Sequence, residues 1–99
     1  MIRFKQLLEL TKDVADLEYQ QIGEDHWRRL GYITEEVGEI AQDLDKNNLE
    51  HARLECVDVI VAAMGMYVQL GGDELELKER WNRGLNKWRK NLERKANEN

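Results

Sequence analysis

Two short motifs contain the residues of this sequence that are best suited to chemistry. Glu36 and Glu39 are three positions apart in an acidic segment that also contains Glu35, and Glu55 and Asp58 repeat that spacing farther along the chain. On an α-helix, residues three apart lie on one side of the axis, about 60° from each other. Carboxylates brought together in this way need a cation between them, and sets of oxygen ligands suit Mg²⁺ or Mn²⁺. If the two segments face each other, the motifs predict a divalent metal site.

The surroundings of the second motif make it the more informative of the two. A Glu-Glu-x-x-Glu string on its own is typical of a solvated helix face. Glu55 and Asp58 instead lie in an apolar segment that runs to residue 68, where an unpaired buried carboxylate is costly. Ion pairs with Arg53, Arg80 or Arg83 would also satisfy these carboxylates, and the spacing alone does not decide between an arginine and a metal ion.

The two histidines and the single cysteine complete no other metal motif. His51 lies one helical turn before Glu55, but a histidine at a helix end is more often a cap or an exposed group than a ligand. Neither His26 nor His51 follows a glutamate by three residues, which excludes the Glu-x-x-His pattern of ferritin-like di-iron bundles. Cys56 has no partner for an internal disulfide, so a reducing, cytoplasmic location is expected.

The elements that must hold these carboxylates are four helices in a single domain spanning residues 1–99. The chain contains no proline, so its breaks come from glycine, asparagine and capping residues. Apolar residues three and four apart predict helices over about 4–22, from near 25 to 46, over about 49–70, and from 73 onward, with a frayed tail after about 94. Gly23 and Gly71 mark two ends, and Asp73 with Glu76 resembles a capping box. The sequence therefore predicts an all-α fold of the four-helix-bundle type.

The second and third helices are expected to form the frame of the site. The short turn at Asn47 and Asn48 predicts that they pack antiparallel, which places one acidic pair opposite the other. The third helix is expected to be buried, because apolar residues occupy nearly every side of it. Gly38 costs the second helix about 0.5–1 kcal/mol relative to alanine, which predicts that something approaches the backbone closely there.

Composition limits the functions that remain. The chain has 99 residues, 41% of them hydrophobic and 35% charged, and its formal net charge of −5 argues against a general binder of nucleic acid polymers or anionic membranes. The N-terminal residues lack the apolar core of a signal peptide, and the longest apolar run is too short to cross a bilayer. On folding, a domain of this size buries only about two-thirds of the surface that its unfolded chain exposes. Assembly into a homodimer or homotetramer is therefore expected.

With both motifs placed, the chain resembles the MazG-like all-α NTP pyrophosphohydrolases, a superfamily related to dimeric dUTPases and dCTP pyrophosphatases. The similarity covers about residues 27–90 and consists of the two acidic motifs in this order, a glycine break and a basic last helix. It implies Mg²⁺-dependent hydrolysis of a (d)NTP to the (d)NMP and pyrophosphate, with Mn²⁺ as a substitute ion, in nucleotide housecleaning or pool control. The resemblance makes Glu35 a supporting or water-orienting residue and implies four metal ligands: Glu36, Glu39, Glu55 and Asp58.

The resemblance also implies that the last helix contacts the substrate phosphates. The corresponding polar edge contains Lys78, Asn82, Asn86 and Arg89. Lys87 is the alternative if the alignment shifts by one position. The chain lacks the arginine-aromatic-proline ending of many relatives, and Leu54 stands where relatives often have a further glutamate.

An alternative function remains open on the residues alone. The chain would then be a non-catalytic helical module that binds a nucleotide or a protein, with its carboxylates paired to arginines. Four residues near the first loop are candidates for base recognition, although packing or plain surface is the more frequent role of such side chains: Tyr19, Gln20, Gln21 and Trp27. The sequence does not indicate the nucleobase, the sugar, the number of metal ions or the general base.

Overall fold

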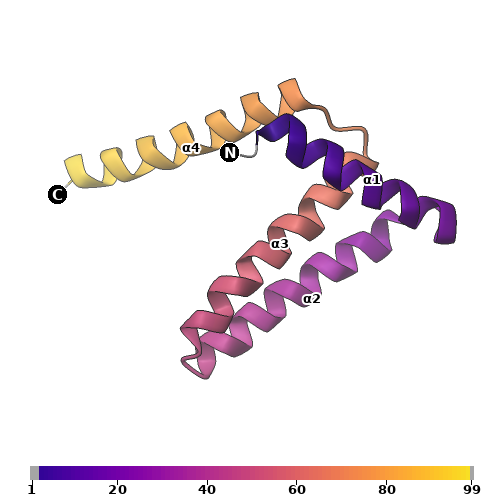
Figure 1. Cartoon of the computed structure of the whole chain (residues 1–99). Coiled ribbons are helices and arrows are strands. Elements are labelled where there is room, and N and C mark those ends of the chain that lie inside the picture. The colour runs from indigo at the N-terminus through magenta and orange to yellow at the C-terminus, as the bar shows by residue number, and fades with distance from the viewer. Residues whose placement is uncertain (1–2, 99) are drawn as a thin grey trace.

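The computed structural model describes residues 3–98, which form four helices and no strand. In chain order these are α1 (Phe4–Ile22), α2 (His26–Asp45), α3 (Leu49–Gln69) and α4 (Glu74–Asn97) (Figure 1). The predicted all-α class is confirmed, and the four helices match the predicted order and nearly the predicted bounds. The helical backbone of α4 continues past residue 94, where the sequence predicts a frayed tail. None of the described helices has the length and apolar character needed to cross a bilayer.

Side-chain caps start three of the four helices. Asp25, Asn48 and Asp73 each accept a hydrogen bond from the backbone N–H three residues later, at 3.0, 3.4 and 2.8 Å. Only half of the capping box expected at Asp73 is formed. The carboxylate of Glu76 lies 2.9 Å from the hydroxyl of Tyr67, which comes from the last turn of α3. The α3–α4 corner is therefore fixed by a tertiary contact as well as by its local sequence.

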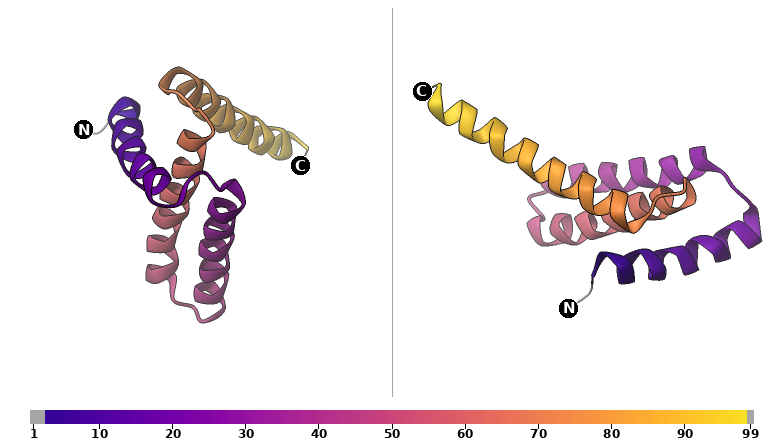
Figure 2. Two further views of the ribbon diagram at one scale, coloured as in Figure 1. Left: turned by 90° about the vertical axis from the view of Figure 1, so that its right-hand side faces the viewer. Right: turned by 90° about the horizontal axis from the view of Figure 1, so that it is seen from above.

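Residues with positive φ form the turns between the helices. Gly23 (φ 76°) ends α1 and Gly71 (φ 93°) follows α3, in a backbone region that residues with a Cβ rarely adopt. Asn47 (φ 57°) makes the tight α2–α3 turn. This turn reverses the chain direction, so the predicted antiparallel hairpin of α2 and α3 is confirmed (Figures 1 and 2).

The other two helices are attached at one end of the α2–α3 hairpin. α1 packs against α3, and α4 packs against α1, in addition to the Tyr67–Glu76 contact at its first turn. The rings of Phe4 and Trp81 meet edge to face where α4 packs against α1, with 5.7 Å between their centroids. The rest of α4 extends away from the hairpin (Figure 1). Within a single chain, the four helices therefore do not close around one core.

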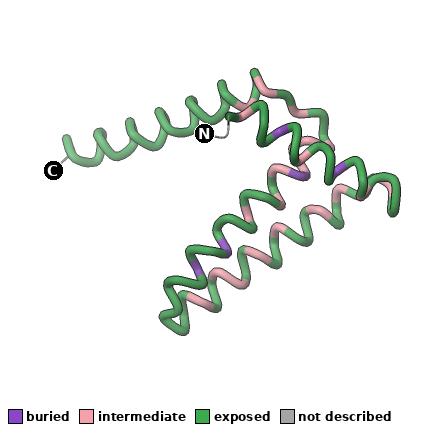
Figure 3. The backbone as a smooth tube through the Cα atoms, in the orientation of Figure 1, coloured by how far each residue is buried: buried purple, intermediate pink, exposed green. Residues whose placement is uncertain are grey.

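Few residues are buried within one chain (Figure 3). Among the described apolar side chains only Leu8, Ala15 and Ala52 are buried. The accessible surface is 8214 Å², whereas a compact monomer of 11.7 kDa exposes about 5,900 Å². The radius of gyration is 16.3 Å, against about 13 Å for a compact chain of this length. The isolated chain therefore exposes more surface than a compact monomer of its mass.

The exposed side of α3 corrects one expectation. Leu54, Val57, Ile60 and Val61 form an apolar row, the α3 stripe, and all four are more than half exposed. The prediction that this helix is buried on every side is therefore wrong for the single chain. The reason is geometric, since α1 and α2 cover only part of the α3 surface and α4 meets α3 at the Tyr67 corner without covering the stripe.

Candidate metal centre

Three of the predicted ligands meet where α2 and α3 face each other. Glu36 and Glu39 lie one turn apart on α2 and face Glu55 on α3. One carboxylate oxygen from each of these residues lies within 4.8 Å of the other two. We call this set the carboxylate triad. The i, i+3 spacing on α2 and the antiparallel direction of α3 together produce it, as the sequence predicts.

The triad contains acceptor atoms that nothing in the described chain satisfies. Glu55 is only 8% exposed, which makes it the one buried charged side chain among the described residues. Glu55 Oε2 and Glu36 Oε2 are both buried without a hydrogen-bond partner. Buried polar groups are nearly always paired, and a carboxylate oxygen can be paired by a proton donor or by a cation. Three carboxylates with two such oxygens form a ligand set that fits Mg²⁺ or Mn²⁺.

The electrostatics of Glu55 follow from this crowding. The adjacent Glu36 carboxylate, burial and the Glu39 carboxylate raise the pKa of Glu55 from 4.5 to about 7. Each of these effects disfavours the ionised form, because the negative charge of Glu55 is placed beside two others and away from water. Near neutral pH the triad therefore holds a proton that a divalent cation would displace.

This raised pKa predicts a pH dependence of stability in the absence of divalent cations. The unfolded chain loses the Glu55 proton near pH 4.5 and the folded chain near pH 7, so the folded state binds more protons between these values. Stability should therefore fall as the pH rises from about 4.5 through 7 and level off above it. Urea midpoints measured across this range in EDTA test the prediction, and Glu55→Gln should flatten the curve. An equal pH dependence in that variant would contradict the assignment of this effect to Glu55.

The other two acidic residues of the motifs lie outside the triad. Glu35 and Asp58 are both exposed, so the expectation that Asp58 points into a crowded interior is wrong for the single chain. The reason is that Asp58 lies on a side of α3 that α2 does not cover, about 60° around the helix from Glu55. Of the four ligands that the resemblance implies, the structure brings three together.

The predicted arginine partners do not pair with the motifs. Among residues 3–98, no ion pair connects Arg53, Arg80 or Arg83 to Glu55 or Asp58. This contact pattern supports the metal interpretation over the ion-pair interpretation that the sequence left open. Gly38 also differs from its expectation, because no atom lies within 4 Å of a Cβ built there. Within the single chain nothing approaches the α2 backbone at that position.

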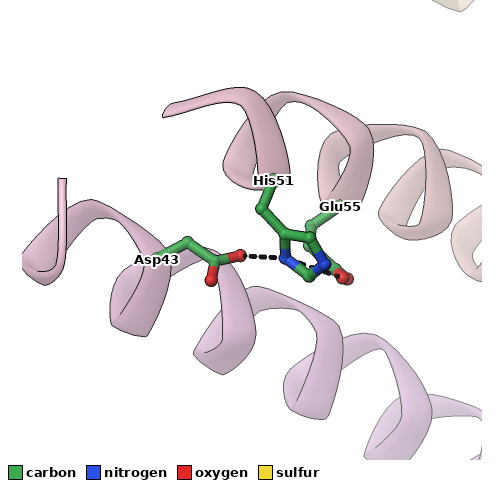
Figure 4. Close-up of side chains that lie close together, drawn as sticks. All are labelled: Asp43, His51 and Glu55. Atoms are coloured by element: carbon green, nitrogen blue, oxygen red, sulfur yellow. Dashed lines mark hydrogen bonds and ion pairs between the residues drawn. The ribbon is translucent and has the colours of Figure 1, made fainter. Parts of the chain in front are cut away.

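Sequence reasoning missed a neighbouring pair of residues. His51 Nδ1 lies 2.9 Å from Asp43 Oδ2 and 3.7 Å from Glu55 Oε1 (Figure 4). The contact with Asp43 raises the pKa of His51. The signal was present in the spacing, because Asp43 follows Glu39 by one turn and His51 precedes Glu55 by one turn. Because α2 and α3 are antiparallel, Asp43 and His51 both lie one turn from the triad toward the α2–α3 loop.

The expected phosphate contacts lie elsewhere in the chain. Lys78, Asn82, Asn86 and Arg89 are all exposed on α4. Among the described residues, α4 meets α3 at the Tyr67–Glu76 contact near the end of α3 and does not pack against α2, so these side chains are not beside the triad of their own chain. Lys78 forms an ion pair with Glu74 at 2.9 Å. Tyr19, Gln20, Gln21 and Trp27 are likewise exposed near the α1–α2 junction.

A second missed feature fixes the position of α2 on α3. The guanidinium of Arg29, on α2, donates a hydrogen bond to the carbonyl oxygen of Ala62 (2.9 Å) and pairs with Glu18 of α1 (3.3 Å). The guanidinium crosses α3 at Gly65, where an added Cβ would overlap Arg29 Nη2. Gln69 donates a further hydrogen bond to Glu18 (3.0 Å). This polar cluster joins three helices and so sets the register that brings the triad together.

Gly65→Ala should therefore destabilise the fold. The new methyl group would displace the Arg29 guanidinium, and we expect a loss of about 1–3 kcal/mol in the free energy of unfolding. Gly31→Ala is the matched control, because a Cβ at this α2 position meets nothing within 4 Å and alanine is favoured in a helix by about 0.5–1 kcal/mol. Urea unfolding of the two variants checks this prediction, and equal midpoints would contradict it.

Comparisons of the chain with protein-family models, curated proteins and solved structures found no match. The carboxylate triad, its unsatisfied oxygens and the order of the sequence motifs are therefore the features that bear on function. These residues could hold a divalent cation between the two facing helices.

Proposed function

We propose that this protein is a Mg²⁺-dependent nucleoside triphosphate pyrophosphohydrolase, which converts a (d)NTP to the (d)NMP and pyrophosphate. The observation that carries the proposal is the carboxylate triad, with its two buried oxygens that lack a hydrogen-bond partner. The resemblance of the motif order to MazG-like enzymes supports the same function. Its biological task would be nucleotide housecleaning or pool control in the cytoplasm, performed by a single MazG-like domain.

Some of the acidic residues would bind the cation, and one would position the attacking water. Glu36, Glu39 and Glu55 would hold the ion, with Asp58 as the fourth proposed ligand. When bound, Mg²⁺ would neutralise the triphosphate and the departing pyrophosphate; Mn²⁺ could substitute. Glu35, which directly precedes Glu36 on α2, would orient the attacking water or support the neighbouring carboxylates. In-line attack at the α-phosphorus would separate the monophosphate from pyrophosphate.

A second copy of the chain would complete the substrate site. The four proposed phosphate-binding residues lie on α4, away from the triad of their own chain: Lys78, Asn82, Asn86 and Arg89. We therefore propose that the α4 of another subunit supplies these contacts in a homodimer or homotetramer. The large accessible surface and the uncovered α3 stripe support such an assembly.

Phosphorus NMR tests the proposed reaction by identifying the bond that breaks. The purified chain would be incubated with Mg²⁺ and, in turn, with canonical and modified (d)NTPs. We expect the signals of a nucleoside monophosphate and pyrophosphate from at least one of them. A nucleoside diphosphate with orthophosphate would contradict the proposed site of attack, and the absence of turnover from every triphosphate would contradict the enzyme.

A non-catalytic helical module is the second candidate function. The observation that favours it is the separation of the α4 cations from the triad within one chain. Calorimetry with Mg²⁺ and a non-hydrolysable triphosphate distinguishes the candidates. A protein-interaction module should give no heat, a nucleotide-binding module should give heat without turnover of the natural triphosphate, and the proposed enzyme should give both heat and turnover.

A further inference from the structure

A second group of potential ligands lies one turn from the triad, toward the α2–α3 loop. It consists of Asp43 on α2 with His51 and Glu55 on α3 (Figure 4). One ligand atom from each residue lies within 4.8 Å of the other two. The ring atom Nδ1 of His51 lies between the carboxylates, 2.9 Å from Asp43 Oδ2 and 3.7 Å from Glu55 Oε1. Glu55 therefore belongs to both groups.

The donor atoms of this group differ from those of the triad. Two carboxylates and one imidazole nitrogen suit first-row transition metals such as Mn²⁺, Co²⁺ and Zn²⁺, whereas Mg²⁺ prefers oxygen alone. Two ligand atoms that are each about 2.1 Å from a metal ion lie about 3.0 Å from each other when the ligand–metal–ligand angle is 90°. They lie about 4.2 Å apart when they are on opposite sides of the ion. The 3.7 Å distance from His51 Nδ1 to Glu55 Oε1 falls within that interval, and the 2.9 Å distance to Asp43 Oδ2 lies just below its lower end. Little side-chain movement is needed to close the three groups around one cation.

The burial of Glu55, the residue shared with the triad, also bears on this group. The Glu55 side chain is 11% exposed, and its Oε2 is buried without a hydrogen-bond partner. The hydrogen bonds within the group therefore do not satisfy it. Asp43 is also largely covered, with 14% of its side chain exposed, whereas the His51 side chain is 57% exposed. The group thus has two shielded acidic ligands and an open side through which an ion can enter.

We propose that Asp43, His51 and Glu55 form a second metal site, which binds a divalent first-row transition metal through the imidazole nitrogen and both carboxylates. This site goes beyond the proposed hydrolase activity, because binding at it requires neither a nucleotide nor turnover. When both groups are filled, Glu55 offers its carboxylate to two ions. The imidazole gives the second site a preference for Mn²⁺ over Mg²⁺ that the triad, made of oxygen alone, does not share.

Pulsed electron paramagnetic resonance of bound Mn²⁺ tests this site directly. Modulation of the spin echo by a coordinated nitrogen reports a histidine ligand, and the full chain contains only His26 and His51. We expect nitrogen coupling in the wild-type chain that survives an excess of Mg²⁺. It should disappear in His51→Gln and persist in His26→Gln, since His26 pairs with Glu24 at the start of α2. Asp43→Asn should weaken Mn²⁺ binding about 10-fold or more.

Each outcome of this experiment decides the proposal. Absence of nitrogen coupling in the wild-type chain, or coupling that persists in His51→Gln, would overturn it. Helical circular dichroism verifies that each variant folds, and the exposed position of His51 makes its replacement a mild change. A failure of the proposed hydrolase would appear as missing nucleotide turnover and would leave the spin-echo result unchanged, so the two proposals fail separately.

Discussion

Glu55→Gln should reduce Mg²⁺-dependent pyrophosphate release by about 100-fold or more. Glu55 is the buried member of the carboxylate triad and lies between Glu36 and Glu39. An amide at this position lacks the negative charge that attracts the cation. Its NH₂ group would also donate hydrogen bonds to the neighbouring carboxylates and so occupy the space of the ion. The measurement is the rate of pyrophosphate release at saturating Mg²⁺.

The same substitution should leave the fold intact and stabilise it in the absence of cations. Replacing a crowded, buried carboxylate by an amide removes repulsion within the triad, so the urea midpoint in EDTA should rise while the helical signal is kept. Glu50→Gln provides a matched control, because it removes the same charge from an exposed position of α3. It should leave activity unchanged. Full activity of Glu55→Gln, or an equal loss in the control, would contradict the role of the triad.

Ile60→Lys should dissociate the assembly into monomers and remove most of the activity. Ile60 lies in the α3 stripe, and a lysine there would place an unpaired charge in the proposed subunit contact. One chain exposes about 2,300 Å² more surface than a compact monomer of its mass, an area typical of obligate interfaces. Light scattering should show the wild-type mass reduced to that of a single chain.

Glu50→Lys serves as the control for this second prediction. It introduces the same side chain on α3 at an exposed polar position in the first turn, outside the stripe. We expect it to keep the wild-type mass. If Ile60→Lys retains the mass and unfolding midpoint of the wild-type chain, the α3 stripe is not the subunit contact. If the wild-type chain is itself a compact monomer, the proposed assembly is wrong.

The local features of the fold could be predicted from the sequence because they depend on short-range chemistry. Gly23, Gly71 and the caps Asp25 and Asp73 act within a few residues of themselves, so the helix bounds follow from composition and spacing. The antiparallel hairpin follows from the short turn between α2 and α3. Once both are known, the facing of Glu36, Glu39 and Glu55 is a consequence of helical periodicity.

The features that the sequence did not predict depend on how the helices are aligned in the fold, or on which sides of a helix remain uncovered in one chain. Arg29 reaches Ala62 across α3 because Gly65 leaves room for it, and no local pattern connects these residues, which are 33 positions apart. His51 meets Asp43 only through the exact pairing of the hairpin arms. An apolar helix such as α3 has the same sequence whether a neighbouring helix or a second subunit covers it. For that reason its exposed side, and the exposure of Asp58, could not be predicted from composition.

We propose that the carboxylate triad holds the divalent cation which meets the triphosphate. A crystal grown with Mn²⁺ and a non-hydrolysable (d)NTP analogue, measured at a wavelength where manganese scatters anomalously, tests it most directly. We predict an anomalous peak bonded to Glu36, Glu39 and Glu55, with phosphate oxygens of the analogue as further ligands. A triad without a peak, or a triphosphate bound away from α2 and α3, would contradict the claim.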